Sequence, residues 1–288
     1  MPEALLGLQG GGVIGMIAAT RIGFQVSNVD LANRFQKFLF EGGWRSARTV
    51  GEALWEAKLV TRSNPTNVRR YSLFGDPAMH LALPEWEIQI DVPDTLRAFQ
   101  RVRIEGRVLR EGRLFDDFDG TVRLRLFDSA SQRRPVEQEL IVSYSHPGSP
   151  LFRGRYDVSG GRFEAIVPLP KDITYRGRRA RVSAIAFAEE GSAFGANGGI
   201  VLSGTDASAP VDNDGPQIDI GFSGRTFAAG DRVPSGSQVH LVLRDESGIN
   251  ITGEVGHGIL LRVGNQRLDV TDDYEAQEDY RVGEIRLD

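Results

Sequence analysis

The 288-residue chain contains 40% apolar and 25% charged residues, and its formal net charge is -5. This composition is typical of soluble globular protein, and the length predicts two domains or three small ones. The acidic balance argues against nucleic acid as a partner, because a nucleic-acid surface is usually strongly basic. The sequence has no cysteine. It therefore excludes disulfides, thiolate metal sites and a thiol nucleophile within these residues.

Residues 1–84 have the pattern of an α/β fold. The apolar run GVIGMIAAT, which begins at Gly12, predicts a strand buried on both faces. A helix is expected after it, capped by Ser27 or Asn28 and ended by Gly42-Gly43. Its apolar stripe consists of Leu31, Phe35, Phe38 and Leu39.

A second helix is predicted to begin at Thr49, because Thr49 and Glu52 have the spacing of a capping box. Asn64-Pro65 is expected to end it. One strand and two helices cannot enclose the core of an α/β fold, since a parallel sheet needs partner strands. We therefore expect the upstream part of this domain to be a partner of the chain.

From residue 85 the apolar period changes to two. Trp86, Ile88, Ile90 and Val92 alternate with polar residues, which predicts a half-buried strand. Short strands with Gly and Pro turns indicate a β-sandwich over residues 85–205. The further predicted strands are residues 101–109, 122–126, 140–144, 162–167 and 178–188.

Residues 206–215 are small, polar and Pro-containing, and we interpret them as a linker. Strands are predicted after it at residues 217–222, 239–244 and 259–263. So few strands cannot close a sandwich, so residues 216–288 are expected to form a second β-sandwich that is incomplete. The predicted fold class is thus α/β followed by two all-β units.

No pattern of catalytic or metal-binding residues is found. There is no G-x-S-x-G motif, and the carboxylate pairs are explained by solvated loops. None of the histidines has a metal-type partner nearby in sequence, so no metal site is predicted. The histidines are His80, His146, His240 and His257.

Two short motifs have mainly structural interpretations. Gly75-Asp76-Pro77 is typical of a turn, because Asp can bond the following backbone and Pro fixes φ. Residues 212–215, with the sequence DNDG, carry oxygen ligands of the kind that Ca²⁺ takes. They lack the rest of an EF-hand loop, so a linker turn is favoured over calcium, and no cofactor is expected.

Several stretches together resemble the gingipain-like peptidase family. Residues 11–35 are similar to the segment after the catalytic cysteine, and residues 49–58 and 71–84, the latter with the sequence YSLFGDPAMHLALP, are similar to the end of that domain. Residues 152–175, residues 245–250 (DESGIN) and residues 274–283 resemble the β regions of the type IX secretion sortase subgroup. The resemblance covers most of the chain.

This resemblance implies a partial caspase-like parallel sheet with helices, followed by immunoglobulin-like units. Family members use a cysteine thiolate activated by a histidine. Both residues precede the matched segment, so no catalytic residue maps onto this chain, and the chain is expected to be inactive alone. Thr20 and Arg21, at the end of the first strand, are expected to contact substrate, because loops after parallel strands gather at the active-site edge.

The resemblance also implies a location at the outer surface of a Gram-negative bacterium, with a signal peptide upstream. Protein or peptide substrates and other secretion-system outer-membrane proteins are then the expected partners. One alternative stays open, which is a non-enzymatic surface protein whose β units bind glycans or proteins.

Overall fold

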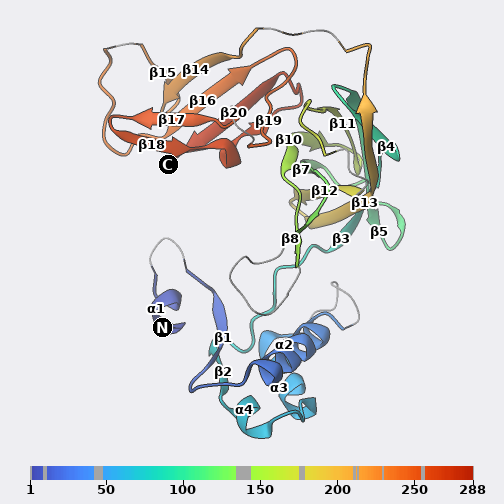
Figure 1. The fold of residues 1–288 in the computed structure, drawn as a ribbon, viewed down its shortest axis with the longest axis vertical. Coiled ribbons are helices and arrows are strands. Elements are labelled where there is room, and N and C mark those ends of the chain that lie inside the picture. The colour runs from blue at the N-terminus through green and yellow to red at the C-terminus, as the bar shows by residue number, and fades with distance from the viewer. Residues whose placement is uncertain are drawn as a thin grey trace. The chain divides into compact units, whose positions relative to one another are not determined.

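The computed structural model describes residues 2–8, 12–41, 48–133, 144–174, 179–209, 212, 214–228, 230–253 and 257–287. The chain divides into two compact units, Met1–Glu85 and Trp86–Asp288. Figure 1 shows the α-helices in the first unit and the strand-rich second unit. The chain is therefore mostly β-sheet with few helices. The boundary between the two units, after Glu85, coincides with the change of apolar period in the sequence.

The first unit contains four helices and two strands in its described residues. A small core of Leu31, Ala57 and Val68 joins three of the helices, and Phe35 and Tyr71 pack against it. The elements are α1 (Pro2–Leu6), β1 (Gly15–Ala19), α2 (Gln25–Leu39), α3 (Val50–Val60), α4 (Pro65–Arg69) and β2 (Tyr71–Gly75).

Strands β1 and β2 run antiparallel, with Gly15 opposite Gly75 and Ala19 opposite Tyr71. The prediction of a parallel sheet is therefore wrong for this pair. β1 is also only half-buried instead of enclosed on both faces. The apolar run located the strand, but the direction of pairing depends on how the chain returns through the 51 residues between β1 and β2, which a local pattern does not contain.

Helix α2 begins at Gln25, two residues before the first predicted cap. The backbone N–H of Phe24, the N-cap residue, donates to Oδ1 of Asn67 over 2.8 Å, and Nδ2 of Asn67 donates to Oδ1 of Asn28 over 2.8 Å. Ser27 lies buried inside the first turn. The cap prediction is wrong because a side chain from α4 satisfies this helix start. Gly42-Gly43 lies outside the described residues.

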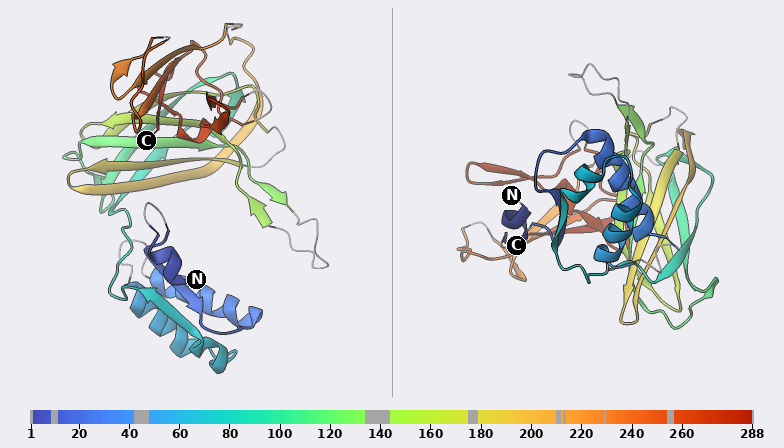
Figure 2. Two further views of the ribbon diagram at one scale, coloured as in Figure 1. Left: turned by 90° about the vertical axis from the view of Figure 1, so that its left-hand side faces the viewer. Right: turned by 90° about the horizontal axis from the view of Figure 1, so that it is seen from below.

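The first half of the second unit is a large, mainly antiparallel sheet, seen from two directions in Figure 2. Its path is β11-β5-β3-β13-β12-β7-β10. β8 and β9 form a separate two-stranded sheet. The strands of this half are β3 (Trp86–Asp91), β4 (Thr95–Ala98), β5 (Arg101–Arg110), β6 (Arg113–Leu114), β7 (Gly120–Phe127), β8 (Ser131–Arg133), β9 (Tyr144–His146), β10 (Pro150–Val158), β11 (Arg162–Pro168), β12 (Arg179–Ala188) and β13 (Gly191–Thr205).

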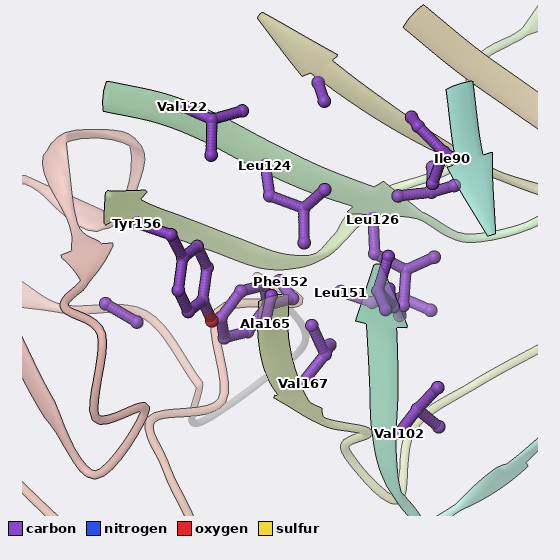
Figure 3. Packing of buried hydrophobic residues seen from close by; sticks show 14 of the residues in the cluster. Ile90, Val102, Val122, Leu124, Leu126, Leu151, Phe152, Tyr156, Ala165 and Val167 are labelled. Atoms are coloured by element: carbon purple, nitrogen blue, oxygen red, sulfur yellow. The ribbon is translucent and has the colours of Figure 1, made fainter. Parts of the chain in front are cut away.

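The core of this half follows from the alternation in each strand. Val122, Leu124 and Leu126 of β7 are 0% exposed, whereas the arginines between them face solvent. Figure 3 shows these side chains beside Phe152 and Tyr156 of β10. Each such burial stabilises the fold by about 1.5–3 kcal/mol, so one buried stripe per strand fixes the register of the whole sheet.

Most predicted strands are present, but several strands were missed, of which β13 is the longest. Its sequence, GSAFGANGGIVLSGT, is rich in glycine, which lowers strand propensity. At Gly195 a Cβ would lie 1.9 Å from the carbonyl oxygen of Ile88, so close packing against β3 requires glycine there. Of the strand predicted at residues 140–144, residues 140–143 lie outside the described part of the chain.

The second half of this unit continues the same sheet instead of standing apart. β19 pairs in parallel with β10, with Ala276 opposite Gly154, and the path runs on through β20, β16 and β14. The two immunoglobulin-like sandwiches stay predictions. The elements are β14 (Gln217–Phe222), β15 (Arg225–Thr226), β16 (Val239–Arg244), β17 (Leu260–Val263), β18 (Gln266–Asp269), the 3-10 helix η2 (Thr271–Asp273), β19 (Glu275–Ala276) and β20 (Val282–Leu287).

Side chains of the first half anchor η2 and β19. Arg153 of β10 donates from Nη1 to the carbonyl oxygen of Thr271 over 2.9 Å and from Nη2 to Asp272. Arg123 of β7 lies 3.3 Å from the carboxylate of Glu275. These bonds hold the two halves in one unit. Within the described residues, no helix combines the length and the apolar content needed to span a bilayer.

Candidate functional site

Thr20 and Arg21 follow β1 directly and are both exposed. The backbone N–H and the hydroxyl of Thr20 both donate to the carbonyl oxygen of Arg70, over 2.8 and 3.0 Å. Within the described residues, no hydrogen bond or ion pair holds the guanidinium of Arg21. Thr20 thus fixes the backbone of this segment, and Arg21 is the group that can contact a ligand.

The segment after Arg21 is apolar and exposed. Ile22 is 89% exposed and Phe24 is 57% exposed. The guanidinium of Arg70 donates to the carbonyl oxygen of Ile22 and lies 6.0 Å from the ring centroid of Phe24. Among the described residues, this edge therefore presents the guanidinium of Arg21 beside apolar side chains. Residues 20–24 contain no Cys, His, Asp or Glu that could act as a nucleophile or transfer a proton.

The predicted turn at Gly75-Asp76-Pro77 lies at the opposite end of the strand pair, because Gly75 pairs with Gly15 and Tyr71 with Ala19. The structure therefore does not bring it together with Thr20 and Arg21. Gly75 has a φ of +133°, and a Cβ there would lie 3.1 Å from the Cα of Gly15. Oδ1 of Asp76 accepts a hydrogen bond from the N–H of Ala78 over 2.8 Å, as expected of an Asx turn.

This turn provides hydrogen-bond acceptors for the free backbone N–H groups at the N-terminus of α3. The N–H of Val50 donates to the carbonyl oxygen of Met79, and the N–H of Gly51 donates to that of Pro77, each over 2.9 Å. Thr49 and Glu52 form the predicted capping box, with both bonds at 3.1 Å. All the donors of the first turn are thus paired, so the motif at residues 75–79 is a structural support.

The histidines do not converge on a catalytic or metal centre. Nδ1 of His146 lies 2.8 Å from the carbonyl oxygen of Pro147. His240 and His257 lie beside carboxylates of Glu284 and Asp172, at 3.3 and 3.2 Å. Among the described residues, no group of three or more His, Cys, Asp or Glu side chains has a geometry that could hold a metal ion.

The carboxylates considered for calcium bond to their own chain. Asp212 accepts from the N–H of Asp214 over 3.0 Å and from the hydroxyl of Ser247 over 2.6 Å. These bonds, that of Ser247 first, hold the pKa of Asp212 below its ordinary value. Asn213 lies outside the described residues. The preference for a linker turn over a calcium site at residues 212–215 stays a prediction.

Sequence reasoning missed two sets of residues that depend on contacts far apart in the chain. Asn67 is 0% exposed and joins α4 to the start of α2. The arginines of β7 and β10 lie opposite one another on one face of the sheet. The alternation of arginine with apolar residues in both strands was a signal for the second set, but only the pairing of the strands brings them together.

Comparison with known proteins gives one family match. Residues 1–82 match the model of Peptidase family C25. Among curated proteins no match was found.

Two solved structures show limited similarity. The crystal structure of dimeric latent PorU from Porphyromonas gingivalis is 25% identical with a TM-score of 0.47, and the alignment covers 86% of this chain and 26% of that chain. This chain thus spans about a quarter of the length of PorU. A superoxide reductase (neelaredoxin) from Ignicoccus hospitalis is 11% identical with a TM-score of 0.25, over 41% of this chain and 80% of that chain.

Both TM-scores are low, so the assignment rests on residues 1–82 and on the motifs in their sequence. The antiparallel strand pair, the capped helix α3 and the Asp76 turn all lie within this matched region. Over residues 1–82 the α/β unit is therefore similar to Peptidase family C25, the family of the gingipains.

Proposed function

We propose that residues 1–82 are the part of a gingipain-like cysteine peptidase domain that supports the active site without carrying the nucleophile. The observation that supports this is the family match over these residues in a chain with no cysteine. A thiolate that works with this segment must come from polypeptide outside the 288 residues. The chain alone is then inactive as a peptidase.

The surface of the α/β unit supports a contact with further polypeptide. Ile14 is 75% exposed, Val26 is 80% exposed and Trp55 is 65% exposed, in addition to Ile22 and Phe24. Within the described part of this unit, β1 pairs only with β2, so its other edge is free to pair. Exposed apolar side chains and a free strand edge are both typical of a surface that another part of a protein covers.

We further propose that this peptidase is a type IX secretion signal peptidase or sortase, which acts on secreted proteins at the outer cell surface. The sequence motifs at residues 152–175 and 245–250 support this proposal. Arg21 then contacts the substrate beside Ile22, and the β unit holds the peptidase domain or its partners.

The experiment begins with the gene sequence on the 5′ side of the codon for Met1. We expect an in-frame segment that carries a histidine and a cysteine. Co-expression of that segment with this chain should give thiol-dependent peptide cleavage that neither part gives alone. Arg21→Ala should lower kcat/KM, whereas Lys37→Ala, another single-charge loss at the last turn of α2, should not.

The alternative function, a non-enzymatic surface protein, predicts a different result. A promoter and a true start at Met1, with no cleavage activity in any combination, would contradict the peptidase proposal and favour the binding protein. Thiol-dependent cleavage by the chain alone would contradict the proposed inactivity.

A further inference from the structure

Five arginines lie on one face of the sheet of the second unit, with Asp157 at its end, although the chain as a whole has a net charge of -5. We define this arginine face by its five members. Strand pairing places Arg123 opposite Arg155 and Arg125 opposite Arg153. Arg181 of β12 lies opposite Phe127, with its guanidinium 4.9 Å from that ring centroid.

Like charges that face one another across a strand pair destabilise a sheet, so the arrangement needs compensation. Two members have it within the second unit. Arg153 bonds to Thr271 and Asp272, and Arg123 lies 3.3 Å from Glu275.

Of the four arginines paired across β7 and β10, the other two, Arg125 and Arg155, have no such compensation. In the part of the chain that the structure describes, no hydrogen bond or ion pair holds Arg125 or Arg155. Nε of Arg155 is shielded from solvent and has no hydrogen-bond acceptor among these residues. An N–H group left unpaired in that position costs free energy, so Arg155 is the least compensated member of the face.

We propose that the arginine face binds an extended acidic segment of a protein partner. Alternate residues of a strand lie about 6.6 Å apart, and neighbouring strands about 4.8 Å apart. Arg125 and Arg155, the two members without a partner, are diagonal neighbours across the strand pair, about 7–8 Å apart, which is close to the distance that separates carboxylates on alternate residues of an extended peptide. Guanidinium groups bind carboxylates through paired hydrogen bonds, which gives such a contact its geometry.

The surroundings of the face favour a peptide over a long polyanion. Phe187 and Phe194 on the neighbouring strands are 46% and 42% exposed and can contact apolar side chains of the segment. A short acidic segment experiences only the local positive charge, because charge beyond about 8–10 Å is screened. A nucleic acid extends further and meets the net negative charge of the whole chain.

The test measures fluorescence anisotropy of labelled peptides with the full chain. One peptide alternates four Glu with four Thr, and the other has the same composition with the four Glu consecutive. The variant Arg125→Gln/Arg155→Gln removes the unpaired charges. The control variant Arg113→Gln/Arg225→Gln removes two exposed charges from β6 and β15 and has the same net charge.

We expect the alternating peptide to bind more tightly than the block peptide. The Arg125/Arg155 variant should weaken its binding about tenfold or more, since two charge-assisted contacts are lost. The Arg113/Arg225 variant should change it by less than about twofold. Circular dichroism and the thermal midpoint should match the unmodified chain for both variants.

Three results would overturn the proposal. Equal binding of the two peptides would mean general charge attraction. Equal losses for the two double variants would mean that the arginine face is not the site. A heparin fragment or single-stranded DNA that binds more tightly than the alternating peptide, with the same dependence on Arg125 and Arg155, would assign the face to polyanions instead.

Discussion

Gly51 and Pro77 meet so closely that no side chain fits between them. The N–H of Gly51 donates to the carbonyl oxygen of Pro77 over 2.9 Å, and a Cβ on Gly51 would lie 2.6 Å from that oxygen and 2.7 Å from the Cβ of Pro77. The first turn of α3 and the Gly75-Asp76-Pro77 turn are therefore built against each other. A substitution in either turn should therefore destabilise both.

Gly51→Ala should destabilise the α/β unit by about 1–3 kcal/mol, the usual range for overpacking. In an open helix the same change is stabilising, because alanine has the higher helix propensity. Hydrogen exchange of the amides at residues 50–53 in the full chain measures the effect. Gly198→Ala is the control, since no atom lies within 4 Å of a Cβ there. An unchanged exchange rate in Gly51→Ala would contradict the contact with Pro77.

Asn67→Ala should lower the free energy of unfolding of the α/β unit by about 1–2 kcal/mol, because it removes two part-buried hydrogen bonds, that from the N–H of Phe24 and that to Oδ1 of Asn28. Asn67→Asp is the matched variant. It keeps the acceptor for Phe24 and loses only the donor to Asn28, whose amide can turn to donate instead. Urea denaturation should therefore give a smaller loss for Asn67→Asp than for Asn67→Ala. Equal losses would contradict the capping role of Oδ1.

The success of sequence reasoning depended on how local each feature is. The Thr49 and Glu52 capping box was predicted and is present, because both partners lie within one helical turn. Strands with clean alternation, such as β7, were located for the same reason. The start of α2 was wrong because its cap comes from Asn67, which is 43 residues from Phe24.

The candidate site was predictable only in part. The position of Thr20 and Arg21 at the end of a strand follows from the apolar run before them. Their separation from Gly75 follows from the antiparallel pairing of β1 and β2, which no local pattern contains. The arginine face could likewise not be predicted from the sequence, because Arg125 and Arg153 come together only through the register of two strands.

The capping box should make α3 sensitive to acid. Hydrogen bonds from the backbone and then the side chain of Thr49 hold the pKa of Glu52 below its ordinary value of 4.5. Because the folded pKa is lowered, the stabilisation is fully present above the unfolded value and is lost as the pH falls through the folded value. Hydrogen exchange of α3 at a series of pH values below 5 should show this loss. In Glu52→Gln the loss should be absent, and the same acid dependence in that variant would contradict the assignment.

Arg153 should matter to the second unit mainly through its bond to a backbone carbonyl. Its side chain is 11% exposed, whereas that of Asp272 is 90% exposed, so the ion pair between them is weakened by solvent. Arg153→Met should therefore leave the carbonyl of Thr271 without its donor and destabilise the unit by about 2 kcal/mol. Asp272→Asn should change the stability by less than about 0.5 kcal/mol. Thermal unfolding, with hydrogen exchange of β19, distinguishes the two, and a larger effect of Asp272→Asn than of Arg153→Met would show that the ion pair is the anchor.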